Sequence, residues 1–196
     1  LHGRLHPNAN TYDPHYTSQT GQLSYEFAKE YNIPVINQGI GGQTSSQIKA
    51  RWARDVLAQT FDVGDGRGSN TLEFGGQKPF AVYLHVGIND VFLGEDENTI
   101  KSNFEFFAQS CKDNNIDLII ANIGADSVYD VEKETKAKNI NEWLSNEFLT
   151  SYPDVELIDY LKWSTGGTLN YKTLKEGSFA DTVHPNINGY KDYANF

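Results

Sequence analysis

The sequence of 196 residues contains no methionine, one cysteine and no long hydrophobic run. The single cysteine, Cys111, excludes an intrachain disulfide framework and a cysteine-based zinc site. No stretch approaches the ~18 consecutive apolar residues of a membrane-spanning helix, so we expect no membrane span. The remaining composition, with 38% hydrophobic and 21% charged residues, is that of an ordinary globular protein, secreted or cytoplasmic.

Basic residues are also scarce. Sixteen Lys and Arg stand against 26 Asp and Glu, which gives a formal net charge of −10. The electrostatic field of this negative net charge repels a phosphate backbone, so we expect no nucleic-acid partner. Because methionine is absent, Leu1 does not look like a translation start, and Asn195-Phe196 carries no helix-ending signal. We therefore expect residues 1–196 to form a single domain that is truncated at both ends.

Strand-like and helix-like segments alternate along the chain. Four short, nearly continuous apolar runs are typical of strands buried on both faces, as in parallel sheets: Pro34–Gln38, Phe80–Val86, Ile116–Ile123 and Val155–Tyr160. Apolar residues at helical spacing predict helices at Thr20–Tyr31, Thr44–Gln59, Thr99–Cys111 and Val131–Thr150. This alternation predicts a doubly wound, three-layer α/β/α sandwich.

Two segments that follow predicted strands carry residues suited to binding a negative oxygen. The first, Asn37–Thr44, is rich in glycine and leads into a helix whose start is marked by a capping box at Thr44 and Gln47. The second contains Asn89 and Asp90, and the amide of Asn89 could donate to an oxyanion. Each feature alone is equally typical of an ordinary turn.

A third segment contains an acid and a base three residues apart. Asp181 precedes His184, so the carboxylate can meet the imidazole within one turn and hold its tautomer. Pro185 and Asn186 follow, and they restrict the backbone beside the histidine. A base oriented in this way is what acyl transfer requires.

These three blocks, in this order, resemble the SGNH (GDSL-type) hydrolase superfamily. They read NQGIGGQT, Gly87-Ile88-Asn89-Asp90 and Asp181-Thr182-Val183-His184. The resemblance implies a flavodoxin-like fold with a parallel five-stranded sheet. It also implies that His184 and Asp181 are catalytic and that Gly42 and Asn89 belong to the oxyanion hole.

The nucleophile block of that family, Gly-Asp-Ser, is absent from the chain together with the strand that precedes it. None of the candidate serines has the strand-turn-helix setting of a nucleophile elbow, so none is assigned: Ser18, Ser24, Ser45 and Ser46. Instead, we expect the native chain to continue upstream of Leu1 with a strand that ends in Gly-Asp-Ser. Residues 1–196 alone are then expected to be inactive and prone to aggregate.

The resemblance implies a serine-type carboxylic ester hydrolase that forms an acyl-enzyme and needs no cofactor. The expected substrate is a small-molecule or carbohydrate ester, with removal of a short acyl group, such as acetyl, from a carbohydrate. Three alternatives remain: a lysophospholipase or thioesterase acting on lipids, a non-catalytic binding module, and a flavin or nucleotide binder on a flavodoxin-like fold.

Several other residues invite a functional interpretation. His2 and His6 lie four apart, but Gly3 and Pro7 argue against a shared helix, so we expect no metal site. His85 lies inside a predicted strand and is expected to be a buried structural histidine. Trp163 follows the last predicted strand, where its indole either stacks on a sugar or packs against its own loop. The glycine-rich segment Thr60–Pro79 is interpreted as a surface connection.

Overall fold

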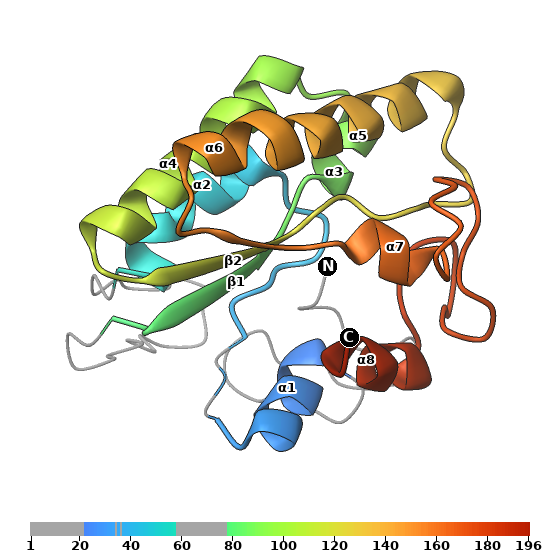
Figure 1. The fold of residues 1–196 in the computed structure, drawn as a ribbon, viewed down its shortest axis with the longest axis horizontal. Helices are drawn as coiled ribbons and strands as arrows, with labels where there is room; N and C mark the ends of the chain where they lie inside the picture. The colour runs from blue at the N-terminus through green and yellow to red at the C-terminus, as the bar shows by residue number, and fades with distance from the viewer. Residues whose placement is uncertain (1–21, 34, 36, 58–77) are drawn as a thin grey trace, which may run out of the picture.

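The computed structural model describes residues 22–33, 35, 37–57 and 78–196 (Figure 1). Three parallel strands form a sheet in the order β1-β2-β3: β1 (Ala81–His85), β2 (Asp117–Ala121) and β3 (Glu156–Ile158). Tyr83 pairs with Ile119, and Ile120 pairs with Leu157. These strands confirm three of the four predicted runs.

The prediction of a strand at Pro34–Gln38 is wrong for the residues that can be judged. Val35, Asn37 and Gln38 lie outside any strand, and the other two residues of this run lie outside the described part of the chain. A strand needs a hydrogen-bonded neighbour. Within the described ranges β1 pairs only with β2, and Val35, Asn37 and Gln38 form no ladder with its other edge. The described sheet therefore has three strands rather than the five of the expected fold.

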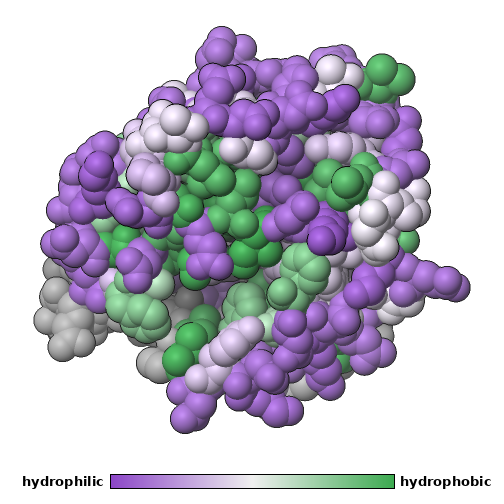
Figure 2. All heavy atoms as spheres, in the orientation of Figure 1, coloured by the Kyte–Doolittle hydropathy of each residue, from purple (hydrophilic) through white to green (hydrophobic). Residues whose placement is uncertain are grey.

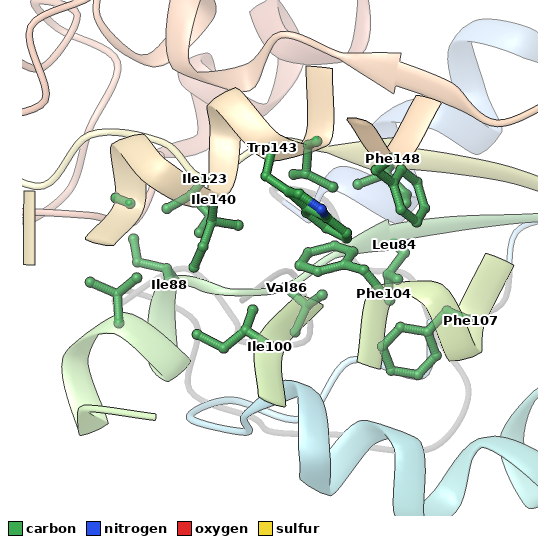
Figure 3. Close-up of a cluster of buried hydrophobic side chains, with 14 of the residues drawn as sticks. Leu84, Val86, Ile88, Ile100, Phe104, Phe107, Ile123, Ile140, Trp143 and Phe148 are labelled. Atoms are coloured by element: carbon green, nitrogen blue, oxygen red, sulfur yellow. The ribbon is translucent and has the colours of Figure 1, made fainter. Parts of the chain in front are cut away.

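One face of the sheet is covered by α2 (Ser45–Asp55), α4 (Glu97–Asp113) and α5 (Val131–Trp143). The last of these continues through a π-helical turn, η1 (Leu144–Phe148), into α6 (Leu149–Ser151). Apolar side chains from these helices and from the strands form the larger core, which includes Leu84, Ile100, Phe104, Phe107, Ile140 and Trp143 (Figure 3).

The opposite face is covered by α1 (Leu23–Tyr31) and α8 (Ile187–Ala194), with α7 (Tyr160–Ser164) after β3 (Figure 1). A second, aromatic-rich core lies here and contains Leu23, Ala121, Tyr160, Trp163, Tyr190 and Tyr193. Helices thus lie on both faces of a parallel sheet, which confirms the three-layer α/β/α arrangement. In Figure 2 hydrophobic side chains gather near the centre of the visible face, between these two sets of helices.

Local sequence signals explain where the helices begin. The hydroxyl of Thr44 accepts the N–H of Gln47, and the Gln47 side chain accepts the N–H of Thr44, so the predicted capping box at α2 is confirmed. Asp96 caps α4 and Asp130 caps α5. A short helix, α3 (Ile88–Leu93), follows β1 directly. In the part of the chain that is described, no helix is long and apolar enough to cross a membrane.

Candidate active site

Asp181 and His184 form a hydrogen-bonded pair, as their spacing predicts. Nδ1 of His184 lies 2.8 Å from Oδ2 and 3.0 Å from Oδ1 of Asp181. Oδ1 also accepts the backbone N–H groups of Val183 at 2.9 Å and of His184 at 2.7 Å. The carboxylate therefore orders the turn and orients the ring at the same time, and it occupies Nδ1 while Nε2 remains for proton transfer.

The pKa of Asp181 reflects two opposing influences. Partial burial raises the pKa of this carboxyl. The backbone N–H groups of His184 and Val183 and the imidazole together lower it by more than burial raises it, so the pKa lies below its ordinary value. The carboxyl is thus ionised at neutral pH. The side chain of His184 is 16% exposed, so its ring is sheltered yet reachable from solvent.

The loop around this pair is framed by backbone hydrogen bonds. Phe179 and Pro185 form an isolated antiparallel bridge, and Ala180 N–H donates to His184 O at 2.8 Å. Asn186 then caps α8 by accepting the N–H of Gly189 at 2.9 Å. The loop is therefore closed immediately before α8 begins, and His184 sits in a fixed frame.

The structure also brings Gly42 and Asn89 close together, from two separate loops. Gly42 has φ of +82° in the turn before α2, a conformation that favours glycine. Asn89 lies in the first turn of α3, and its Nδ2 donates to the carbonyl of Gln43, the neighbour of Gly42, at 2.9 Å. The hydrogen bond between Asn89 and Gln43 thus places the two predicted oxyanion donors next to each other.

A buried network beneath these donors was not foreseen from the sequence. Asp90 is fully buried, and its carboxylate accepts the backbone N–H of Ser45 at 2.9–3.0 Å together with the Ser45 hydroxyl. Nδ2 of Asn103, from α4, donates to the hydroxyls of Ser45 at 2.9 Å and Ser46 at 3.0 Å. Burial raises the pKa of Asp90, and the hydrogen bonds from Ser45 oppose that shift. The serines at the start of α2 therefore have structural partners.

The segment after β2 connects the two halves of the site. The ring of Tyr129 packs against Phe92 of α3 at 5.5 Å between centroids. Two residues earlier in the chain, the N–H of Ser127 contacts the carbonyl of Thr182 at 3.4 Å, inside the loop that carries His184. Residues 126–129 thus touch both the helix that bears Asn89 and the Asp181–His184 loop.

Two further interpretations can be judged. Trp163 is 2% exposed, its ring stacks on Tyr160 at 5.2 Å, and its Nε1 donates to Asp192 at 2.7 Å. The sugar-stacking interpretation is therefore wrong. The indole does pack, but against Tyr193 of α8 as well as against its own segment, so the interpretation of packing against its own loop holds only in part. His85 lies 4.2 Å from the ring of Tyr160, and burial lowers its pKa to about 3, which suits a structural histidine.

Other candidates lie outside the described residues, namely Ser18, His2, His6 and most of the glycine-rich segment Thr60–Pro79. Ser24 is described: its side chain is buried within α1, away from any strand-turn-helix setting. Among described residues, no group of three or more His, Cys, Asp and Glu side chains could hold a metal ion.

Comparison with known proteins assigns the chain to a family. A model of the GDSL-like Lipase/Acylhydrolase family matches residues 9–191. The chain therefore belongs to this family, within the SGNH/GDSL superfamily of hydrolases. An acetylxylan esterase from Geobacillus stearothermophilus is 37% identical over 67 residues, which is 34% of this chain and 22% of that relative. The chain thus matches about a fifth of the length of this curated relative.

Solved structures share the fold at low sequence identity. A variant of an acetyl-xylooligosaccharide esterase from Geobacillus is 18% identical with a TM-score of 0.68, covering 96% of this chain and 86% of that chain. A protein assigned to the G-D-S-L lipolytic family from Desulfitobacterium hafniense is also 18% identical, with a TM-score of 0.67 over 88% of this chain and 84% of that chain. Both likenesses concern the fold alone.

Proposed function

We propose that the protein is a serine-type carboxylic ester hydrolase in which His184 is the general base. The observation that carries this proposal is the Asp181–His184 pair, in which the carboxylate lies 2.8 Å from Nδ1. This contact holds the imidazole with Nε2 free to take a proton, and it stabilises the imidazolium that results. Membership of an acylhydrolase family supports the same chemistry.

The catalytic cycle has two acyl-transfer steps. A serine hydroxyl, which we place upstream of Leu1, attacks the acyl carbonyl while His184 takes its proton. His184 then passes that proton to the departing alcohol, which leaves an acyl-serine. In the second step His184 takes a proton from water as the water oxygen attacks the acyl carbonyl, and it then passes that proton to the departing serine oxygen as the acid is released.

The tetrahedral oxyanion is held by the backbone N–H groups of Gly42 and the serine and by the amide of Asn89. Nδ2 of Asn89 carries two N–H bonds, and the one that donates to Gln43 leaves the other for the oxyanion. Because the Asn89 amide is held by Gln43 O before substrate binds, little reorganisation of this donor is needed in the transition state.

For the substrate, we propose an acetyl group or another short acyl group on a carbohydrate. The support is the sequence similarity to an acetylxylan esterase and the shared fold with an acetyl-xylooligosaccharide esterase. The test is the rate of hydrolysis of p-nitrophenyl esters from acetate to dodecanoate, and of acetylated xylo-oligosaccharides, by the full-length protein. We expect the highest kcat/KM on acetate and release of acetate from the oligosaccharide.

The alternatives give different results in the same assay. Preference for long acyl chains would indicate a lipid esterase. Absence of turnover on every ester would indicate a non-catalytic binding module. The coding sequence upstream of Leu1 provides a second test, because the proposal requires a serine there that follows a β-strand.

A further inference from the structure

Asn103 is a buried polar residue that the proposed mechanism does not use. It lies in the middle of α4 and is 3% exposed. Asparagine is a weak helix former, and burying its amide is costly unless hydrogen bonds compensate for the lost hydration. The other buried residues of α4 are apolar and belong to the larger core, part of which Figure 3 shows: Ile100, Phe104, Phe107, Ala108 and Cys111. Asn103 thus interrupts an otherwise apolar helix face.

The amide of Asn103 binds the first turn of α2. Its Nδ2 donates to the hydroxyl of Ser45 at 2.9 Å and to the hydroxyl of Ser46 at 3.0 Å, so both of its N–H bonds are used. The Ser45 hydroxyl in turn donates to the carboxylate of Asp90. A chain of hydrogen bonds therefore runs from Asn103 in α4, through Ser45 in α2, to Asp90 in α3.

A second hydrogen bond joins α2 and α4 further along. Nε1 of Trp52 donates to the hydroxyl of Ser110 at 2.9 Å, and the Trp52 ring packs on Phe107 with 4.7 Å between centroids. Trp52 follows Ser45 by seven positions, and Ser110 follows Asn103 by seven. The two helices therefore run in parallel and are joined at two points about two turns apart. The Asn103 end of this contact lies beside the predicted oxyanion donors, and the Ser110 end lies away from them.

We propose that Asn103 is a positioning residue for the oxyanion hole and acts through Ser45 and Ser46. Asp90 joins the two turns that carry the oxyanion donors, and Asn103 anchors these joined turns to α4 and so to the larger core. The donors then keep their place relative to the acyl carbonyl. The proposal rests on the proposed function, because the place of these donors matters only if they stabilise an oxyanion.

The test compares Asn103→Ala with Ser110→Ala, which removes the Trp52 hydrogen bond of the same helix pair. On p-nitrophenyl acetate, the full-length Asn103→Ala variant should lose roughly 10- to 100-fold in kcat with little change in KM. The reason is that displaced donors weaken binding of the transition state more than binding of the substrate. Ser110→Ala should keep near-normal kcat although it lowers the midpoint of urea denaturation. Wild-type kcat in a folded Asn103→Ala variant, or an equal loss in Ser110→Ala, would overturn the proposal.

Ser46→Ala is the milder variant if Asn103→Ala does not fold, because the bond from Asn103 to Ser45 remains. It should lower kcat by roughly 2- to 10-fold, the equivalent of one hydrogen bond, again with little change in KM. Wild-type kcat in Ser46→Ala would contradict the proposal.

A double-mutant cycle with Asn89→Ala distinguishes positioning from a general loss of stability. If Asn103 places the oxyanion donors, Asn103→Ala should reduce kcat by a smaller factor in the Asn89→Ala background than in wild type. Strictly additive losses would overturn the proposal.

A readout that needs no turnover separates this proposal from the proposed function. The backbone N–H of Ser45 donates to Asp90, and its hydrogen exchange reports local opening of the first turn of α2. Measured relative to the amides of β2, which report global unfolding, this exchange should be roughly 10-fold faster in Asn103→Ala and unchanged in Ser110→Ala. If wild type hydrolyses no ester, the proposed function fails while the exchange rates still judge the anchoring. Unchanged exchange in Asn103→Ala would contradict it.

Discussion

The carboxylate of Asp90 binds both the backbone N–H and the hydroxyl of Ser45, 45 positions earlier in the chain. This relationship fastens the first turn of α2 to the first turn of α3. Gly42 precedes one turn and Asn89 lies in the other, so the two proposed oxyanion donors move as one unit. The interaction is buried, and solvent does not compete for it.

Ser45→Ala tests this contact between Asp90 and Ser45. The substitution leaves Asp90 with fewer donors and removes one acceptor of the Asn103 amide, so we expect a loss of about 1–3 kcal/mol in unfolding free energy. We also expect kcat to fall more than KM rises. Chemical denaturation and steady-state kinetics measure both. Ser102→Ala, at an exposed serine of α4, is the control and should change neither stability nor kcat. If Ser45→Ala also changed neither, the Asp90–Ser45 contact would not hold the two turns together.

Asn89→Ala should lower kcat by roughly 10²–10³ while KM changes little, because the oxyanion exists only near the transition state. The relevant measurement is a full Michaelis–Menten curve on p-nitrophenyl acetate. Asn139→Ala, at an exposed asparagine of α5, serves as the control. A change in KM alone would make Asn89 a ground-state binding residue.

Trp163→Ala should destabilise the protein by about 3–5 kcal/mol, because a large buried side chain is removed from the aromatic core. Trp163→Phe should lose less, since it retains the ring packing and forfeits the bond to Asp192. Thermal denaturation measures the order of the two variants. Both variants should lower the rate of hydrolysis of a glycan ester and of a p-nitrophenyl ester equally. A selective loss on the glycan ester would indicate a role of Trp163 in sugar binding.

Gly189→Ala should destabilise the loop that carries His184. A Cβ at this position would lie 2.1 Å from Ser178 O, a backbone atom that cannot move aside cheaply. Gly41→Ala is the matched control, because no atom of the described residues lies within 4 Å of its Cβ position. Denaturation curves of the two variants should differ clearly. Equal stabilities would show that the contact between α8 and residue 178 relaxes easily.

Much of the fold follows from local sequence patterns. The apolar runs that became β1, β2 and β3 and the helical periods that became α2 and α4 are short-range signals. The Asp181–His184 pair could also be predicted, since three positions in one turn suffice to bring the groups together. Asn89 was identified by its place after a strand.

Features that depend on distant partners could not be predicted. Nothing near Asp90 in the sequence indicates that its carboxylate binds Ser45. Trp163 was ambiguous because its burial depends on rings contributed by α8, which follows much later in the chain. The apolar run at Pro34–Gln38 has strand-like composition, but a strand also requires a neighbour to pair with.

The central claim is that His184, oriented by Asp181, is the base of an ester hydrolase. Its most direct test is kcat on p-nitrophenyl acetate for full-length wild type, His184→Ala and Asp181→Asn, with thermal denaturation of each. We predict that His184→Ala loses roughly 10³-fold or more and that Asp181→Asn loses less, because the base remains but is poorly oriented. Both should unfold near the wild-type temperature, because these side chains are partly exposed. Near-normal turnover in a folded His184→Ala variant would contradict the account.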